Sequence, residues 1–230
     1  MTVIPDALDF VSAALLACAG ITVWRAILKA EVTKGQWLGT VGSGGGLGHL
    51  GVQFARKKGI KVVGIDARDA GIELSTKVGT DLVLDARNDQ NEVVKKGLKA
   101  TDGKGVPASI VLSEAQSAPA LACAITMKHG RMVQVAPPLE IVIPSAELVF
   151  RDIAIAGSLT GSPKQTQEML EFAAENNIQA EANVNYGLDK VPQMFEDFHS
   201  GKMKEKSVVV VDQGLQSLYL KAHGNLSSCT

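Results

Sequence analysis

The sequence lacks a marked excess of either positive or negative charge. Its 230 residues contain 23 Lys and Arg against 24 Asp and Glu, which gives a formal net charge of −1, and no block of basic residues occurs. This balance argues against binding to nucleic acid or to a membrane surface, since both attract a positively charged patch. The 46% of hydrophobic residues is ample for one large domain, or for one domain with an appendage.

Cysteines are also few. Cys18, Cys123 and Cys229 are odd in number and far apart, which favours reduced thiols over a disulfide framework. The N-terminus lacks the basic start and the long apolar run of a signal peptide. We therefore expect a cytoplasmic protein.

A long uninterrupted apolar run is the third absence. The most apolar early stretch, residues 13–28, contains Arg25 as well as Gly20 and Thr22. A membrane-spanning helix needs about 20 predominantly apolar residues. The sequence therefore predicts a buried helix and turn here rather than a membrane span.

A glycine-rich turn between apolar segments is the strongest feature that is present. Residues 37–42 form a short apolar run of strand length, and residues 47–58 carry apolar residues at helical spacing. Residues 61–65 are apolar and largely β-branched, as a buried parallel strand should be, and they are followed by Asp66. This order predicts one strand–helix–strand unit.

The glycines in this turn predict binding of a dinucleotide. A pyrophosphate binds to backbone N–H groups at a helix N-terminus, where side chains must be absent. We place the phosphates directly after the first strand. A second register, residues 46–51, also fits the pattern G-x-G-x-x-G, and a plain tight turn is the alternative without a ligand. The glycines of the favoured register are Gly44, Gly45, Gly46 and Gly48.

Asp66 indicates which dinucleotide is preferred. It lies 18 positions after Gly48, where an acidic side chain accepts hydrogen bonds from the adenosine ribose hydroxyls. A carboxylate at this place repels a 2′-phosphate, so the sequence favours NAD(H) over NADP(H). Arg68 weakens this preference without reversing it.

The rest of the chain alternates short apolar strands with helices, which is typical of an α/β fold with a doubly wound parallel sheet, the Rossmann fold. Residues 165–176 form an amphipathic helix, followed by a last strand, helix and strand. Before the glycine turn, Asp6 or Asp9 is expected to cap a first helix, and a turn leads into a second one. Further strands are expected at residues 82–84, 109–112, 131–135, 152–159, 182–186 and 207–211, and further helices at 70–78, 92–99, 118–127 and 191–199.

Four segments resemble, in sequence and in order along the chain, segments of the medium-chain, zinc-dependent alcohol dehydrogenases, particularly of the microbial and yeast-like branch. They are IPDALDFVSAALLACAGITVWRAI, GQWLGTVGSGGGLGHLGVQFARKKGIKVVGID, PSAELVFRDIAIAGSLTGS and FHSGKMKEKSVVVV. The resemblance implies that the chain begins where the catalytic domain of the family is ending. It divides the chain into a lead-in (1–28), the NAD-binding domain (29–162), a closing helix with a catalytic-domain remnant (163–212) and a polar tail (213–230).

The resemblance also suggests that zinc is absent. Cys18 lies where the family has its third zinc-binding cysteine, in the motif L-L-C-A-G-x-T, but a catalytic zinc needs three protein ligands. No histidine lies at a ligand position of the family; the four are His49, His129, His199 and His223. We expect Cys18 to be a buried thiol, and His49 to face the helix surface or the cofactor edge.

Further cofactor contacts are implied by the same resemblance. Thr22 and Leu47 match positions that pack on the nicotinamide, and the backbone at Val135, Ala136 and Ser158 matches the part that holds the nicotinamide end. Cys18 and Thr22 are the catalytic candidates that remain. Two departures weaken NAD binding: Lys206 replaces an arginine that contacts the pyrophosphate, and Gly71 replaces a lysine.

Three functions are consistent with these residues. The first is an NAD-linked oxidoreductase that transfers hydride between nicotinamide and an alcohol or carbonyl. The second is a truncated, non-catalytic NAD-binding module, and the third is an enzyme that uses the exposed cofactor cleft for non-redox chemistry on an apolar metabolite. In all three, residues 153–158 resemble the subunit-contact strand of the family and predict a homodimer.

Overall fold

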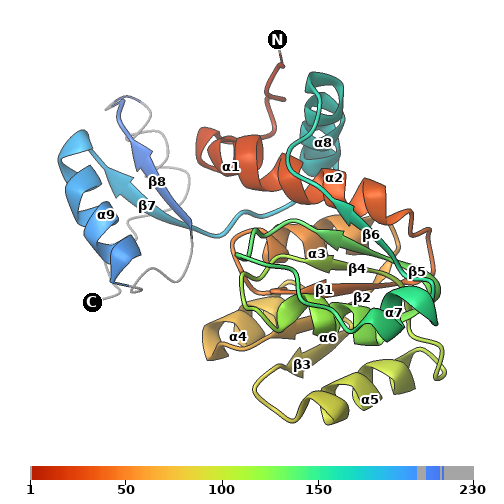
Figure 1. Cartoon of the computed structure of the whole chain (residues 1–230). Coiled ribbons are helices and arrows are strands. Elements are labelled where there is room, and N and C mark those ends of the chain that lie inside the picture. Colours follow the sequence, from red (N-terminus) through yellow and green to blue (C-terminus); the bar gives the residue numbers. More distant parts are fainter. Residues whose placement is uncertain (1, 201–205, 213, 215–230) are drawn as a thin grey trace.

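A six-stranded parallel sheet forms the body of the protein (Figure 1). The computed structural model describes residues 2–200, 206–212 and 214. The strand order β3-β2-β1-β4-β5-β6, with helices on both faces, confirms the predicted doubly wound Rossmann fold. The strands are β1 (Trp37–Val41), β2 (Lys61–Asp66), β3 (Leu82–Asp85), β4 (Val106–Val111), β5 (Thr126–Gln134) and β6 (Ala154–Gly157).

Helices cover the two faces of the sheet unequally. The face covered by α2, α3 and α8 contains the larger apolar cluster, and α5 and α6 cover the other face. The helices of the main body are α1 (Phe10–Leu15), α2 (Ile21–Ala30), α3 (Gly48–Lys57), α4 (Asp69–Lys77), α5 (Gln90–Ala100), α6 (Ala118–Ile125), α7 (Ser145–Val149) and α8 (Pro163–Glu175).

Side chains of the central strands alternate between these two faces. Leu38 of β1 pairs with Val62 of β2, and both belong to the cluster beneath α2 and α3. Val41 pairs with Ile65, and both belong to the cluster beneath α5 and α6. Because both faces are buried, the strands are apolar throughout rather than alternately polar.

The N-terminal segment is one helical run rather than two helices separated by a turn. Asp9 caps α1 by accepting a hydrogen bond of 2.9 Å from the Ser12 N–H, and a π-helical turn, η1 (Leu16–Gly20), joins α1 to α2. By length and composition, residues 10–30 could cross a membrane, but 61% of their most apolar window is buried in the fold. The buried helices of water-soluble proteins can have the same length and composition, so these two properties are weak evidence for a membrane span.

The end of α6 and the start of β5 differ from the predicted boundaries because α6 ends early. The helix stops at Ile125, and Thr126, which has extended backbone, begins β5. The Thr126 hydroxyl donates to the carbonyl oxygen of Ala122 at 2.7 Å and lies 2.8 Å from Ser109 Oγ. These hydrogen bonds join the end of the helix to β4, which itself begins at Val106 rather than at residue 109.

A small lobe follows the Rossmann sheet. After α8 the chain forms β7 (Ala182–Tyr186), η2 (Leu188–Lys190), α9 (Val191–His199) and β8 (Lys206–Val210). β7 and β8 pair in parallel, with Ala182 opposite Lys206. Figure 1 shows this lobe in blue beside the main sheet. Except for Gly214, the predicted polar tail at 213–230 lies outside the described residues.

Candidate functional site

The glycine turn lies between β1 and α3, at the carboxyl end of the sheet. It begins at Gly42, whose positive φ of 87° permits the sharp turn and whose N–H donates to the Ile65 carbonyl at 2.7 Å. Within the described part of the chain, the N–H groups of Gly46 and Leu47 donate to no other residue. Unpaired N–H groups at a helix N-terminus form a site for an anion.

The glycines of this turn serve two different purposes. A Cβ atom on Gly44 would lie 1.7 Å from the Gly71 carbonyl oxygen, and one on Gly48 would lie 2.0 Å from that of Gly42. The packing of the turn itself therefore requires these two glycines. A Cβ on Gly45 would contact nothing closer than 3.4 Å, so the backbone at this residue is open to a ligand.

The alternative register, residues 46–51, ends on Gly51, which has a packing role within α3. A Cβ atom there would lie 2.6 Å from Val23 Cγ2, so this glycine allows α3 to approach α2. Since α3 already begins at Gly48, Gly51 lies within the helix and away from its free N-terminus. This packing role is compatible with either register, but the open backbone at Gly45 belongs only to residues 44–48, so the geometry favours the predicted register.

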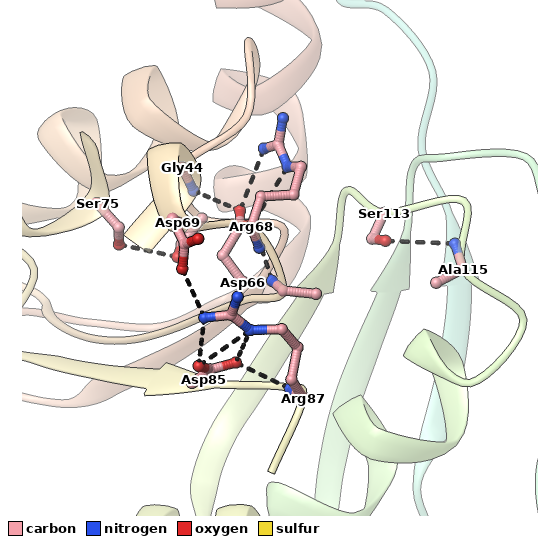
Figure 2. Close-up of polar contacts among 11 residues, drawn as sticks. Gly44, Asp66, Arg68, Asp69, Ser75, Asp85, Arg87, Ser113 and Ala115 are labelled. Atoms are coloured by element: carbon pink, nitrogen blue, oxygen red, sulfur yellow. Dashed lines mark hydrogen bonds and ion pairs between the residues drawn. The ribbon is translucent and has the colours of Figure 1, made fainter. Parts of the chain in front are cut away.

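Asp66 joins the end of β2 to this turn (Figure 2). Its carboxylate is buried, with 3% of the side chain exposed, and accepts hydrogen bonds from the N–H groups of Gly44 at 3.0 Å, Ala67 at 3.0 Å and Arg68 at 3.2 Å. The Arg68 guanidinium lies 3.3 Å from one carboxylate oxygen and 3.4 Å from the other. A ribose hydroxyl that binds Asp66 must therefore displace Arg68 or share the carboxylate with it.

The contacts of Asp66 explain why residue 71 is glycine. A Cβ atom on Gly71 would lie 2.3 Å from an Asp66 carboxylate oxygen. With Asp66 in this conformation, no larger residue fits at this place. The departure from the family's lysine is thus part of the packing between α4, the glycine turn and Asp66.

A second group of charges lies beside Asp66, at the end of β3. Arg87 bridges Asp85 and Asp69 with N–O distances of 2.7 Å to each (Figure 2). Its hydrogen bonds lower the pKa of Asp85 to about 2, so this carboxylate stays ionised at neutral pH. The bridge joins the start of α4 to the end of β3 on the side of Asp66 where an adenosine would lie in a Rossmann fold.

The residues expected near the nicotinamide lie at the ends of other strands. The N–H groups of Val135 and Ala136 both donate to the Val111 carbonyl at 3.1 Å, and that of Ser158 donates to Gln134 at 2.9 Å. Among the residues that the structure describes, the buried Ser158 hydroxyl has no hydrogen-bond partner. An unpaired buried hydroxyl is costly, and a ligand group bound here would relieve that cost.

Thr22 and Leu47 approach this region from two helices. Thr22 is buried in α2, which packs against both α3 and β5. Leu47 and Val135 pack at the border of the same apolar cluster. The structure thus places these predicted residues on the side of the sheet that bears the glycine turn.

Lys206 reaches the glycine turn from the small lobe. A Cβ atom on Gly46 would lie 2.9 Å from Lys206 Cγ and 3.1 Å from its Cε. The lysine side chain therefore lies over the open part of the turn, where a phosphate would bind. It brings a positive charge to this place without the bidentate geometry of an arginine.

This geometry agrees with the comparisons to known proteins. Residues 46–175 match the family model described as zinc-binding dehydrogenase. The chain belongs to this family. An alcohol dehydrogenase from Geobacillus stearothermophilus is 34% identical over 210 residues, which are 91% of this chain and 60% of that protein.

Solved structures of zinc-binding dehydrogenase relatives share the fold. The alcohol dehydrogenase of the archaeon Aeropyrum pernix aligns with a TM-score of 0.76 and 28% identity over 86% of this chain and 57% of its own. A cinnamyl alcohol dehydrogenase from Sorghum bicolor aligns with a TM-score of 0.78 and 27% identity over 90% and 57% of the two chains. The chain thus spans about 60% of the length of these relatives.

The expectation that Cys18 is a buried thiol is wrong. The residue lies in the π-helical turn, which leaves its side chain exposed. Within residues 2–200, 206–212 and 214, no group of three or more His, Cys, Asp or Glu side chains is placed to hold a metal ion. The described residues therefore do not fit a catalytic zinc, which needs three protein ligands.

The histidines have other partners. His129 pairs with Asp152 at 3.0 Å, and the His199 ring lies 2.7 Å from the Phe195 carbonyl oxygen; His223 is outside the described residues. His49 does not face the helix surface, since only 2% of it is exposed.

Sequence reasoning missed a hydroxyl network beneath the glycine turn. The Ser75 hydroxyl of α4 donates to Ser43 Oγ at 2.8 Å and lies 2.9 Å from Thr80 Oγ1. Ser43 and Ser75 are fully buried, so these hydrogen bonds are shielded from water and hold the turn against α4. Serine and threonine are common in loops, so no sequence signal separates these three residues from solvated ones.

Proposed function

We propose that this chain is an NAD(H)-binding oxidoreductase of the alcohol dehydrogenase type, which transfers hydride between nicotinamide and an alcohol or carbonyl compound. The observation that carries the proposal is one juxtaposition: the unpaired N–H groups of Gly46 and Leu47 lie beside the strand end that bears Asp66. This is the arrangement that a pyrophosphate and its adjoining ribose require. The named relatives are alcohol dehydrogenases, which supports the reaction class.

Each part of the site then has a role. The N–H groups of Gly46 and Leu47 bind the pyrophosphate, and Lys206 adds a positive charge above them. Asp66 accepts hydrogen bonds from the ribose and disfavours a 2′-phosphate. When bound, NAD(H) supplies the hydride acceptor or donor.

The nicotinamide end would be held by another set of residues. Thr22 and Leu47 offer packing surface, and the unpaired Ser158 hydroxyl offers a hydrogen bond. The backbone at Val135 and Ala136 lies at the carboxyl end of β5, the edge at which ligands bind in open α/β sheets.

We derive no step through zinc, because the described residues do not supply its ligands. The same observation favours a second candidate, a non-catalytic NAD-binding module, since no described metal site would polarise a carbonyl. The two are separated by incubating the protein with NAD⁺ and a panel of alcohols. Formation of NADH supports the enzyme, and NAD binding without turnover supports the module.

Cofactor binding is tested by calorimetric titration with NADH. The wild-type chain should bind, whereas Gly46→Val should lose binding by at least about 100-fold, because the branched side chain covers the free N–H groups and displaces Lys206. Among the described residues, the three atoms nearest to an added Cβ all belong to the flexible Lys206 side chain, so the melting temperature should stay within a few degrees of wild type. Equal binding by both proteins would contradict the proposal.

We further propose that the protein is a cytoplasmic homodimer joined through β6. This strand is the last in the sheet, so one of its edges is unpaired within the described residues. Exposed apolar side chains lie on or near it, including Ile155 and Phe150. Unpaired edges of this kind pair readily with a second copy, and a two-fold axis would continue the sheet across both subunits.

Ile155→Lys should convert such a dimer into a monomer, because a charged side chain on an edge strand opposes edge-to-edge pairing. Sedimentation velocity gives the mass of each species. Leu188→Lys is the matched control, since Leu188 is an exposed apolar residue of the small lobe and its replacement should leave the dimer intact. A wild-type protein that sediments as a monomer would contradict the proposed dimer.

A further inference from the structure

His49 connects the glycine turn to the chain that enters the small lobe. Its Nδ1 lies 3.0 Å from the Gly45 carbonyl oxygen, and its Nε2 lies 3.2 Å from the N–H of Glu181. A carbonyl can only accept and an N–H can only donate. The ring must therefore be neutral and protonated at Nδ1, so that it donates to Gly45 and accepts from Glu181.

Gln53, one helical turn later, makes a second connection to the same segment. Its side-chain oxygen accepts from the Gln179 N–H at 2.9 Å, and its amide nitrogen donates to the Gln179 carbonyl at 2.8 Å. That nitrogen also lies 3.1 Å from the His49 carbonyl oxygen. One face of α3 thus holds residues 179–181, which lead directly into β7.

The starts of both strands of the small sheet therefore lie close to the same turn. β7 begins next to Glu181, which His49 holds, and β8 begins at Lys206, which lies over Gly46. Ala182 and Lys206 are register partners across the two strands. A change in the position of residues 179–181 would therefore also move the lysine that covers the phosphate site.

We propose that His49 is a positioning residue that couples occupation of the glycine turn to the placement of the small lobe. The inference rests on the proposed function, because the ligand at the turn is the cofactor pyrophosphate. A phosphate held at Gly46 and Leu47 fixes the turn and, through the Gly45 carbonyl, the His49 ring. The ring in turn holds Glu181 and the start of β7.

The charges around His49 make this connection sensitive to pH. Burial lowers the pKa of His49 from its ordinary value of 6.5; Glu181 opposes this shift, and Lys206 and Lys77 add to it. Glu181 also forms an ion pair with Lys77 of α4 at 2.7 Å. Protonated Nε2 would place one N–H group against that of Glu181, so the hydrogen bond is lost in the charged form.

The sign of the pH effect follows from the lowered pKa. Above pH 6.5 the ring is neutral in both the folded and the unfolded chain, and the connection is intact. As the pH falls below 6.5, the unfolded chain takes up the proton first, so the stability contributed by His49 decreases. It is lost once the pH passes below the pKa in the folded protein.

Hydrogen exchange measured by mass spectrometry tests the coupling on wild type, His49→Gln and His49→Leu. In the wild type at pH 7.5, NADH should slow exchange of peptides covering residues 179–186 about three- to tenfold, the factor that one ordinary hydrogen bond provides. His49→Leu should bind NADH yet lose this protection. His49→Gln keeps a donor and an acceptor and does not titrate, so it should retain the protection as the pH is lowered through the range below 6.5 in which the wild type loses it.

Other outcomes separate this inference from the proposed function. If the wild type binds no NADH, the proposed function fails, but the exchange of the ligand-free proteins still tests His49. At pH 7.5, ligand-free His49→Leu should then exchange residues 179–186 faster than wild type and His49→Gln. Equal exchange in all three proteins, or the same pH dependence in wild type and His49→Gln, would overturn the role of His49.

Discussion

Gly44→Ala should lower the free energy of unfolding by about 3 kcal/mol or more and abolish NADH binding. The added Cβ would lie 1.7 Å from the Gly71 carbonyl oxygen and 2.5 Å from its Cα, both of which are backbone atoms. No side-chain rotation relieves such a contact, so the turn or α4 must move. Overpacking that requires backbone movement typically costs about 1–3 kcal/mol, and occasionally more.

Movement of the turn would also disturb the ribose acceptor. Gly44 donates its N–H to Asp66 at 3.0 Å, and α4 packs on the same carboxylate through Gly71. A displaced turn therefore leaves a buried carboxylate with one donor fewer, which adds to the loss of stability. For this reason binding and stability should fall together in this variant, unlike in Gly46→Val.

Gly45→Ala is the matched control for this prediction. Its Cβ would contact the Gly42 carbonyl oxygen at 3.4 Å and Arg68 at 3.7 Å, which are ordinary van der Waals distances. Its free energy of unfolding, measured by urea denaturation, should stay within about 0.5 kcal/mol of wild type. If Gly44→Ala and Gly45→Ala lose the same stability, the packing role assigned to Gly44 is wrong.

The βαβ unit could be predicted from the sequence because its determinants are local. Apolar strands, a helical pattern and Asp66 at the following strand end all lie within residues 37–66, and the structure confirms these elements at nearly the predicted bounds. The family segments reinforced this prediction. The sequence patterns could not provide the orientation of the side chains, which decides what surrounds the glycine turn.

Two of the unpredicted features depend on contacts between residues distant in sequence, and the third depends on a local irregularity of a helix. Gly44 needs its small size because of Gly71, which no pattern within the turn reveals. His49 is buried because the segment near Glu181 returns to cover it. Cys18 is exposed because a π-helical turn continues the N-terminal helix where a turn was expected. The apolar residues around His49 and Cys18 in the sequence did not indicate that the first is buried and the second exposed.

Asp66→Ser should reverse the preference between NADH and NADPH. In the wild type Arg68 is held by the carboxylate, with N–O distances of 3.3 and 3.4 Å. Removal of the carboxylate takes away the ribose acceptor and leaves the guanidinium, more than half of whose side chain is exposed, free to bind a 2′-phosphate. Hydrogen bonds to a charged group contribute about 1.5–3 kcal/mol, so NADH should bind roughly 10- to 150-fold more weakly while NADPH gains affinity.

Fluorescence titration of both cofactors on one protein preparation isolates this effect, since any loss of stability cancels in the ratio of the two dissociation constants.

Arg68→Ala should shift the ratio in the opposite direction, toward NADH, because Asp66 is then uncovered and the 2′-phosphate has lost its cation. Asp69→Ser is the control: this exposed carboxylate pairs with Arg87 and not with Arg68, so the ratio should stay as in wild type. A shift in Asp69→Ser as large as that in Asp66→Ser would mean that the preference depends on the overall negative charge at this edge. The specific contact between the ribose and Asp66 would then have to be abandoned.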